Sequence, residues 1–172
     1  AWEATVAAAQ LDALAVGGEV ALVEDLVARR EYGALAVGRR AALGASSSWP
    51  DRAGGLVPLA VPGRTLLPGG YALEAAVLPR TGAEYRAAGP LEAYLDAAAC
   101  GRRLWLRTRR PGDRFQPLGM DGQKKLQDLF VDDKVPRAER DRVPLVVSPR
   151  GIAWVVGCRL DERFRLGPET RQ

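Results

Sequence analysis

The sequence predicts an α+β fold, in which a mixed or antiparallel sheet of short strands is accompanied by a few short helices. Two observations favour it. Short apolar runs separated by Pro and Gly fill most of the chain after residue 55, as expected of short strands and turns. The few helical patterns do not alternate regularly with these runs, which argues against a doubly wound parallel sheet. The chain has 172 residues, 47% of them hydrophobic, enough for one domain, or one and part of a second, with a core.

The first 55 residues predict a mixture of elements followed by a linker. Residues 2–15 are rich in Ala and free of Gly and Pro, which predicts a short helix. We expect strands at Glu19–Val23 and Ala34–Gly38, with a helix at Asp25–Arg30 between them. Residues 44–55 are rich in Ser and Gly and read as a linker. We therefore expect one unit over residues 1–45 and a second over 46–172.

The second unit is expected to alternate between strands and turns, with two helical interruptions. The expected strands are Leu56–Val61, Tyr71–Leu78, Glu92–Leu95 and Leu104–Thr108, then a hairpin of Leu145–Ser148 and Ile152–Gly157 around Pro149-Arg150-Gly151. Lys124–Asp132 predicts a helix because Leu126, Leu129 and Phe130 share one face. Pro136–Arg142 begins with Pro and predicts a second, highly charged helix. Arg159–Phe164 reads as a final strand edge or cap.

Composition excludes several classes of function. The chain has no histidine, which excludes a Ser-His-Asp triad, a histidine base and a histidine-ligated metal within it, and we expect no metal site. Its two cysteines are too few for a disulfide framework and fit a reducing cytosol, so we expect a cytoplasmic protein. Neither GxxxxGK[ST] nor GxGxxG occurs.

The sequence gives no sign of a membrane protein or of secretion. There is no run of 18 apolar residues, which excludes a membrane-spanning helix, and no basic segment followed by an apolar core at the N-terminus. The chain opens at Ala1 without Met, which suggests a cut from a longer chain, although removal of the initiator would look the same.

Charge is distributed unevenly along the chain. The net charge is +4, but residues 1–96 hold eight basic and eleven acidic side chains, whereas residues 97–172 hold seventeen and ten. A basic second half indicates an anionic partner, or a basic surface that only aids solubility.

The densest cluster of cations follows one expected strand. If residues 104–108 form a strand, Leu104 and Leu106 point to the core, and Trp105, Arg107 and Arg109 point to the other side. Arg103 would point the same way, so this face would carry three guanidinium groups around the indole of Trp105. Such guanidinium groups could bind a phosphate backbone, and the indole could stack on bases. The alternative is that Trp105 is packed and the arginines pair with nearby acids.

A turn and a lysine pair follow this strand. In Arg110-Pro111-Gly112-Asp113, Pro111 fixes φ and Gly112 permits the positive φ of a type II turn. Asp113 is expected to play a structural role, bonding a backbone N–H or an arginine fork. Lys124 and Lys125 would lie where a helix begins, a region that favours anions, or else on a solvated face.

At this point several linked motifs resemble one family, the bacterial tRNA(Ile)-lysidine synthetases, in their C-terminal domain. The motifs are RTRRPGDRF at 107–115, PLGM at 117–120, KKLQD at 124–128, KVPR at 134–137, ERDRVP at 139–144, WVVG at 154–157 and RLDERF at 159–164. Residues 58–96 look like the preceding part of the same region, and residues 1–45, which match loosely, like a remnant of the middle domain or a connector.

The resemblance implies a function. The family uses ATP with magnesium to adenylate cytidine 34 of the isoleucine tRNA with a CAU anticodon, after which lysine displaces AMP in a C–N ligation. That chemistry belongs to an N-terminal PP-loop domain with an SGGxDS-type loop, which Ser46-Ser47-Ser48 does not match. We therefore expect no catalytic residue or cofactor in this chain. The resemblance implies a non-catalytic part that holds the tRNA, including its acceptor stem, with a fold similar to a domain of the phenylalanyl-tRNA synthetase β chain.

The expected site follows from this. The resemblance places tRNA contacts on Arg107, Arg109, Arg110, Arg114, Lys124, Lys125 and Arg137. A stacking role for Trp105 comes from strand alternation alone. The expected partners are the isoleucine tRNA and the PP-loop domain. A homodimer, in which a second copy of the chain is the partner, is a further possibility. The alternative function is a docking module, whose basic sheet face packs on the catalytic domain or a second subunit. An independent enzyme is disfavoured because the chain lacks a nucleotide loop and clustered metal ligands.

Overall fold

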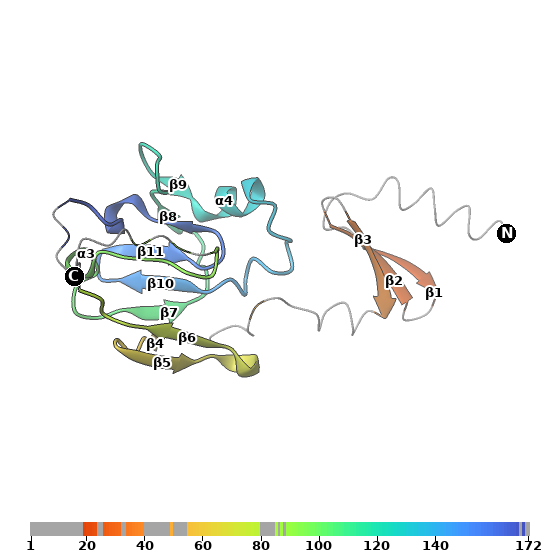
Figure 1. Ribbon diagram of the computed structural model, residues 1–172. Helices are drawn as coiled ribbons and strands as arrows, with labels where there is room; N and C mark the ends of the chain where they lie inside the picture. The colour runs from red at the N-terminus through yellow and green to blue at the C-terminus, as the bar shows by residue number, and fades with distance from the viewer. Residues whose placement is uncertain are drawn as a thin grey trace. The chain divides into compact units, whose positions relative to one another are not determined.

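The computed structural model describes two compact units, with the boundary between Ser48 and Trp49 and with Lys134–Glu139 assigned to the first (Figure 1). It describes residues 19–23, 26–31, 34–39, 49, 55–79, 85, 87, 89–168 and 170. The helix expected over residues 2–15 and most of the expected linker lie outside the described residues. The interpretation of the two units as a domain remnant and a tRNA-binding domain stays a prediction.

The first unit contains a three-stranded antiparallel sheet. Its strands are β1 (Glu19–Val23), β2 (Leu26–Glu31) and β3 (Ala34–Arg39), in the order β1-β2-β3. The two expected strands are confirmed, but the helix expected at Asp25–Arg30 is wrong, because this segment forms β2. A six-residue stretch is too short to form a stable helix alone, whereas as a strand it pairs on both edges and buries Val27 and Ala28 completely.

The second unit is built on a five-stranded sheet in the order β12-β11-β10-β7-β4, in which every pair is antiparallel. The strands are β4 (Val57–Pro58), β7 (Trp105–Arg107), β10 (Leu145–Ser148), β11 (Gly151–Val155) and β12 (Arg159–Leu160). The α+β class with a sheet of short strands is thereby confirmed. The hairpin of β10 and β11 around Pro149-Arg150 is also confirmed, and β10 has the bounds expected from sequence.

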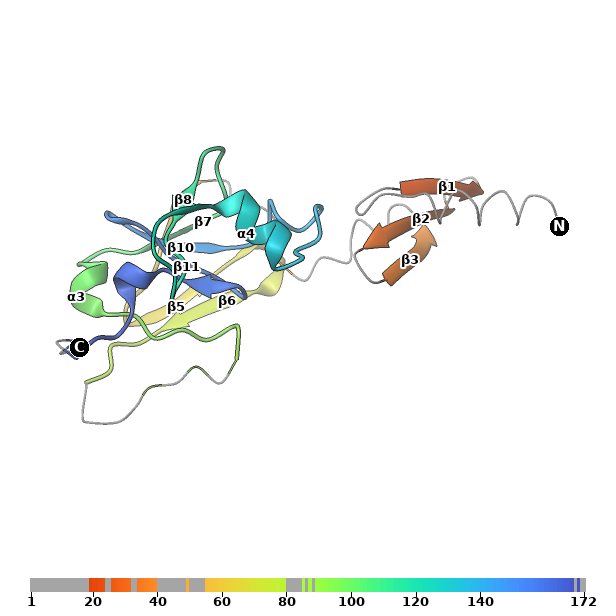
Figure 2. The ribbon, with the colours of Figure 1, turned by 90° about the horizontal axis from the view of Figure 1, so that it is seen from above.

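Smaller elements surround this sheet (Figures 1 and 2). They are the hairpin of β5 (Gly63–Leu66) and β6 (Ala72–Ala75) with η1 (Pro68–Gly70) between them, α3 (Ala97–Cys100), the ribbon of β8 (Arg114–Phe115) and β9 (Lys124–Lys125), α4 (Leu126–Asp132) and η2 (Glu162–Phe164). None of the helices in the described part of the chain is long and apolar enough to cross a membrane.

Three local expectations for this unit are wrong. Glu92–Leu95 is irregular: Glu92 N–H bonds back to Gly89, and the next segment pairs with η2 through Asp96 N–H and the Phe164 carbonyl. Pro136–Arg142 forms turns because its charged side chains offer no apolar face to hold a helix against a core. The lysine pair forms β9, so the helix starts only at Leu126.

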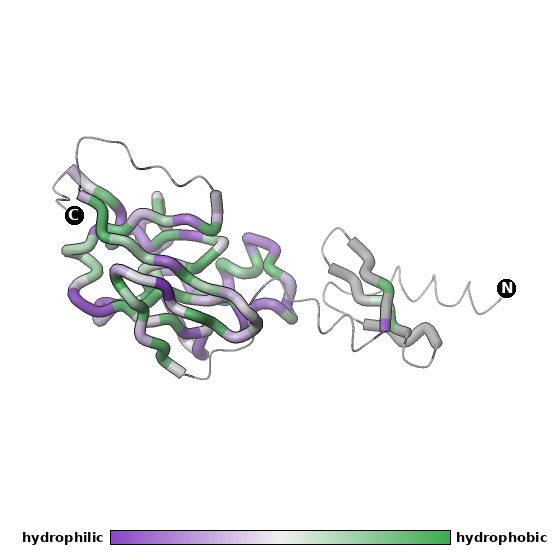
Figure 3. Tube along the Cα trace, turned by 60° about the horizontal axis from the view of Figure 1, so that its bottom comes forward, coloured by the Kyte–Doolittle hydropathy of each residue, from purple (hydrophilic) through white to green (hydrophobic). Residues whose placement is uncertain are grey.

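Both faces of the five-stranded sheet are covered. Successive residues of a strand point to opposite faces, and all four residues of β10 are buried. On one face the register aligns Leu106, Val146 and Trp154, which pack with Leu59 and Leu73 in a single cluster. On the other face Leu145 and Val155 are opposite each other and fully buried. Figure 3 shows hydrophobic stretches alternating with hydrophilic ones along the trace of this unit.

A buried carboxylate joins three parts of the second unit. Asp161 is fully buried, and its Oδ2 accepts hydrogen bonds from the Gln116 backbone N–H at 2.9 Å and from Arg163 Nη2 at 2.8 Å. Its Oδ1 accepts from the backbone N and the Nε of Arg163, at 3.0 and 2.9 Å. Its own N–H donates to the Ala153 carbonyl in β11. Asp161 therefore ties the end of β8 to β11 and to η2, and these hydrogen bonds raise the pKa of Arg163.

Replacing this carboxylate should destabilise the second unit strongly. Asp161→Ala leaves two backbone N–H groups, those of Gln116 and Arg163, and the Arg163 guanidinium without their acceptor. We expect a loss of about 3 kcal/mol or more in the free energy of unfolding. Urea denaturation followed by tryptophan fluorescence measures this change. Asp121→Ala, at an exposed position between β8 and β9, is the matched control and should change stability by less than about 0.5 kcal/mol. Equal effects of the two variants would contradict the role given to Asp161.

Candidate nucleic-acid interface

The Arg110–Asp113 turn has the conformation that its sequence predicts. Gly112 has a φ of 84°, and the N–H of Asp113 donates to the Arg110 carbonyl at 3.2 Å. The Asp113 Oδ2 accepts in return from the Arg110 N–H at 2.8 Å. A residue with a Cβ is strained at this φ, so glycine suits the position. The turn fixes the direction in which the chain leaves β7 and enters β8.

Arg107 and Asp113 form a two-pronged ion pair within this loop. Arg107 Nη1 and Nη2 donate to the two Asp113 oxygens at 2.6 and 2.8 Å, and Nη1 also donates to the Thr108 carbonyl. Their side chains are only 12% and 14% exposed. Asp113 thus bonds both a backbone N–H and an arginine fork, and Arg107 is committed to holding the loop.

Arg109 and Trp105 are also engaged within the chain. Arg109 Nε donates to Asp141 Oδ1 at 2.5 Å, and Trp105 is half-buried, opposite Pro58 on one side and Val147 on the other. The open face expected on β7 is therefore only partly present: Arg107 and Arg109 pair with acids, whereas Arg103 is exposed. Those acids belong to the same chain. The docking alternative therefore cannot rely on Arg107 and Arg109 being unpaired and available to the acids of a partner.

The lysine pair divides between two environments. Lys124 is opposite the buried Phe115 and forms an ion pair with Asp132 of α4. Lys125 is opposite Arg114, and both side chains are exposed. The strand alternation of β9 therefore points one lysine toward the protein and the other away from it.

Among the expected contacts between β7 and β9, three exposed cations have no partner within the described residues. Within the described part of the chain, the side chains of Arg110, Arg114 and Lys125 make no hydrogen bond or ion pair, and we call these three the cationic ribbon. Arg114 and Lys125 are directly opposite each other across β8 and β9, an arrangement in which like charges repel. Asp113, the nearest acid in sequence, is already neutralised by Arg107. A bound anion would relieve the repulsion, so this ribbon can bind phosphate.

Arg137 is the last of the expected contacts. It is exposed, and it lies in Lys134–Glu139, the segment assigned to the first unit. The expected site residues thus fall into three groups: a loop and strand fixed by ion pairs (Arg107, Arg109, Lys124, with Trp105 packed), the cationic ribbon, and Arg137 in the other unit.

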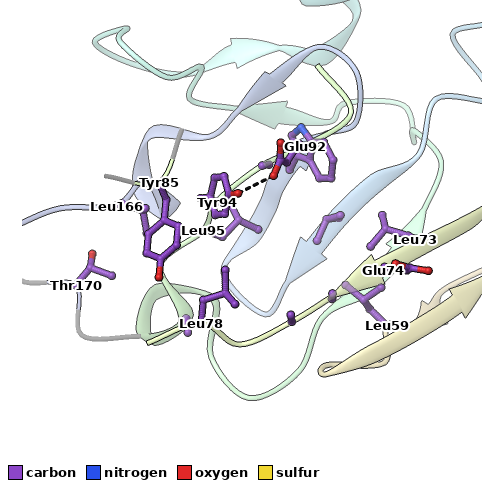
Figure 4. A pocket seen from close by; sticks show the side chains of 16 residues that line it. Leu59, Leu73, Glu74, Leu78, Tyr85, Glu92, Tyr94, Leu95, Leu166 and Thr170 are labelled. Carbon is purple, nitrogen blue, oxygen red and sulfur yellow. Dashed lines mark hydrogen bonds between the residues drawn. The ribbon is translucent and has the colours of Figure 1, made fainter. Parts of the chain in front are cut away.

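One apolar hollow in the second unit does not gather catalytic groups. It has a volume of about 310 Å³, with Leu59, Leu73, Tyr85 and Trp154 among its walls (Figure 4). Its main polar contact is between its own walls, since Tyr94 Oη donates to Glu92 at 2.6 Å and this bond raises the pKa of Tyr94. Among the residues that the structure describes, no three Cys, Asp or Glu side chains gather to hold a metal ion.

The two thiols are poor nucleophiles. Burial, with a smaller contribution from Asp96, raises the pKa of Cys100 to about 11. Burial raises the pKa of Cys158 to about 11, with a smaller contribution from the negative charge of Asp133, while the positive charge of Arg159 lowers it. The reactive form is the thiolate, so neither residue supports thiol catalysis near neutral pH.

Breaking the Arg107–Asp113 pair should destabilise the loop. Asp113→Ala removes the acceptor of three N–H groups, and we expect a loss of about 2 kcal/mol in the free energy of unfolding. Arg107→Lys keeps the charge but loses the fork, and should cost about 1 kcal/mol. Urea denaturation measures both. If Asp113→Ala is as stable as the unchanged chain, the pair does not hold this loop.

The raised pKa values predict slow alkylation. At pH 8 a thiol with a pKa of about 11 carries about 100-fold less thiolate than one at 9.0, so iodoacetamide should modify both cysteines correspondingly slowly. The rate should rise about tenfold per pH unit up to pH 10, because the thiolate fraction does so. Mass spectrometry measures the rate, with the chain in urea as the control. A rate in the folded chain that levels off near pH 9 would contradict the prediction.

Comparisons with known proteins give matches over the second unit. The family model "TilS substrate C-terminal domain" matches residues 104–172. A tRNA(Ile)-lysidine synthase from Symbiobacterium thermophilum is 45% identical over 115 residues, which is 66% of this chain and 24% of that protein. One from Dehalococcoides mccartyi is 40% identical over 103 residues, 60% of this chain and 22% of that protein. The chain thus spans about a quarter of the length of these relatives.

A solved structure extends the match to the fold. It is described as the crystal structure of the TILS C-terminal domain and is 33% identical, with a TM-score of 0.57, over 68% of this chain and 90% of that one. The similarity expected to a phenylalanyl-tRNA synthetase domain stays a prediction. With a sequence match and a structural match over the same region, the chain belongs to the family of tRNA(Ile)-lysidine synthase C-terminal domains.

Proposed function

We propose that this chain holds tRNA, as the non-catalytic C-terminal part of a tRNA(Ile)-lysidine synthetase. Family membership supports the proposal, since the relatives are named for a reaction on tRNA. According to this proposal, a separate N-terminal PP-loop domain binds ATP with magnesium and joins lysine to cytidine 34. The residues of this chain bind and position the RNA for that step and take no part in the bond changes.

The observation that carries the proposal is the cationic ribbon. Arg114 and Lys125 are opposite each other, and Arg110 lies in the turn that leads into β8. All three are exposed, and each side chain lacks a partner among the described residues. An A-form stem presents phosphates and 2′-hydroxyls along a shallow minor groove. Guanidinium forks and ammonium groups bind such phosphates and release counterions, which gives most of the affinity for a nucleic acid.

The remaining expected residues take supporting roles in this proposal. Arg107 holds the loop that presents Arg110, and Trp105 packs beneath it. Arg109 and Lys124 belong to ion pairs that keep partial exposure, so each can turn toward a phosphate and remain near its acid. Arg137 is exposed and stays an expected contact.

The finer part of the proposal concerns which tRNA is bound and where. We propose the isoleucine tRNA with a CAU anticodon, held at its acceptor stem, in the cytoplasm. Because the stem lies far from cytidine 34, the holding part and the catalytic domain can engage one tRNA at the same time. Association of two copies is compatible with this arrangement, and the mass of the tRNA complex in solution tests it.

Removing the ribbon should weaken tRNA binding in a salt-dependent way. We expect fluorescence anisotropy of labelled isoleucine tRNA, titrated with the chain at several salt concentrations, to give a log–log slope that implies several phosphate contacts. Arg110→Ala/Arg114→Ala/Lys125→Ala should reduce the slope by roughly 2–3, because each lost contact accounts for about 0.7–0.9.

The control is Arg64→Ala, an exposed arginine of β5 beside Glu74, which should leave the slope unchanged. Elongator methionine tRNA and duplex DNA serve as competitors, and preference for isoleucine tRNA tests the finer proposal separately. If the unchanged chain does not bind tRNA at low salt, the holding function is wrong.

A further inference from the structure

A second group of arginines lies where β7 begins and β10 turns into β11. Arg102 and Arg103 follow α3 and precede β7, and Arg150 lies in the turn between β10 and β11. All three are exposed. We call these three residues the second arginine site. Arg103 belongs to the guanidinium groups that the sequence analysis places beside Trp105, whereas Arg102 and Arg150 do not.

The pairing of β7 with β10 brings these residues together. Trp105 is opposite Val147 in an antiparallel register, so Arg103, two residues earlier, is level with Pro149, two residues later. Arg150 Nη1 donates to the Ala99 carbonyl of α3 at 3.4 Å, which places its guanidinium beside the start of the Arg102 segment. Figure 1 shows α3 and the β10–β11 turn at the same end of the sheet.

The acids near this end are already engaged. Asp161 is buried beneath Arg163, whose Nη1 donates to the Arg150 carbonyl. Asp96 accepts from the Ala99 N–H and the Thr170 hydroxyl. Within the described residues, Arg102 and Arg103 make no hydrogen bond or ion pair with their side chains. This end of the sheet is therefore positively charged and open to an anion.

The positions of the two cationic groups favour one class of anion. Arg103 precedes β7 and Arg110 follows it, so cations lie before and after the same strand. The backbone of a nucleic acid carries a series of phosphates, so one molecule can contact both groups at once. The two groups thus fit one polyanion that carries many charges.

We infer that the tRNA backbone also contacts Arg102, Arg103 and Arg150, so that one RNA molecule is held at both ends of β7. This inference rests on the proposed function and adds a second contact region to it. The arginines of this region bind phosphate and 2′-hydroxyl groups without reading sequence, so they should contribute equally to binding of isoleucine and methionine tRNA.

The test uses the whole 172-residue chain and labelled tRNA in the same salt series. Arg102→Ala/Arg103→Ala leaves the Arg150 contact with α3 intact, so we expect an unchanged unfolding midpoint in urea and a slope lower by about 1.5. Arg102→Lys/Arg103→Lys keeps both charges and should retain the slope. In combination with the ribbon variant the two reductions should add, because the groups are distant from each other.

The outcomes separate this inference from the proposed function. Binding of tRNA by the unchanged chain, with the same slope in Arg102→Ala/Arg103→Ala, would overturn the second contact region and leave the holding function standing. A loss of slope in the lysine variant equal to that in the alanine variant would also overturn it, because the effect would not follow charge. Absence of binding by the unchanged chain would overturn both.

Discussion

The second unit depends on one buried carboxylate. Asp161 is removed from water, so its carboxylate oxygens need hydrogen-bond donors, and these come from two separate segments, Gln116 and Arg163. The Gln116 N–H ends β8, Arg163 belongs to η2, and the N–H of Asp161 itself reaches β11. Asp161 therefore holds β8, the strand that carries Arg114 of the cationic ribbon, in position without itself contacting a ligand.

Ion pairs sort the cations of one short motif into two kinds. In the segment that runs from β7 into β8, Arg107 and Arg109 are held by Asp113 and Asp141, whereas Arg110 and Arg114 are not paired within the described chain. The ion pairs restrict the side-chain conformations of Arg107 and Arg109 and hold the loop in one conformation. Arg110 and Arg114 belong to this ordered segment, so placing them against phosphates costs less conformational entropy. A dense run of arginines therefore combines a structural and a binding role.

Sequence reasoning succeeded where the signal was local. The bounds of β10, the turn at Gly112 and the arginine fork on Asp113 follow from apolar runs, glycine and spacing within a few residues. It failed where distant segments decide. The second face of β7 is covered, and Asp141 lies 32 residues after Arg109, so alternation along one strand could not reveal either the cover or the pair. The helix expected at Asp25–Arg30 failed for the same reason, since two neighbouring strands determine β2.

The central claim is that the unpaired cations of the ribbon contact tRNA first, while Arg107 keeps its ion pair with Asp113. The most direct test is a ¹H–¹⁵N spectrum of the arginine Nε–H groups, recorded as tRNA is added to the whole chain. The account predicts that the signals of Arg110 and Arg114 shift or broaden first, while those of Arg107 and Arg163 keep their positions because their forks stay on Asp113 and Asp161. Movement of the Arg107 signal with no change at Arg110 and Arg114 would contradict it.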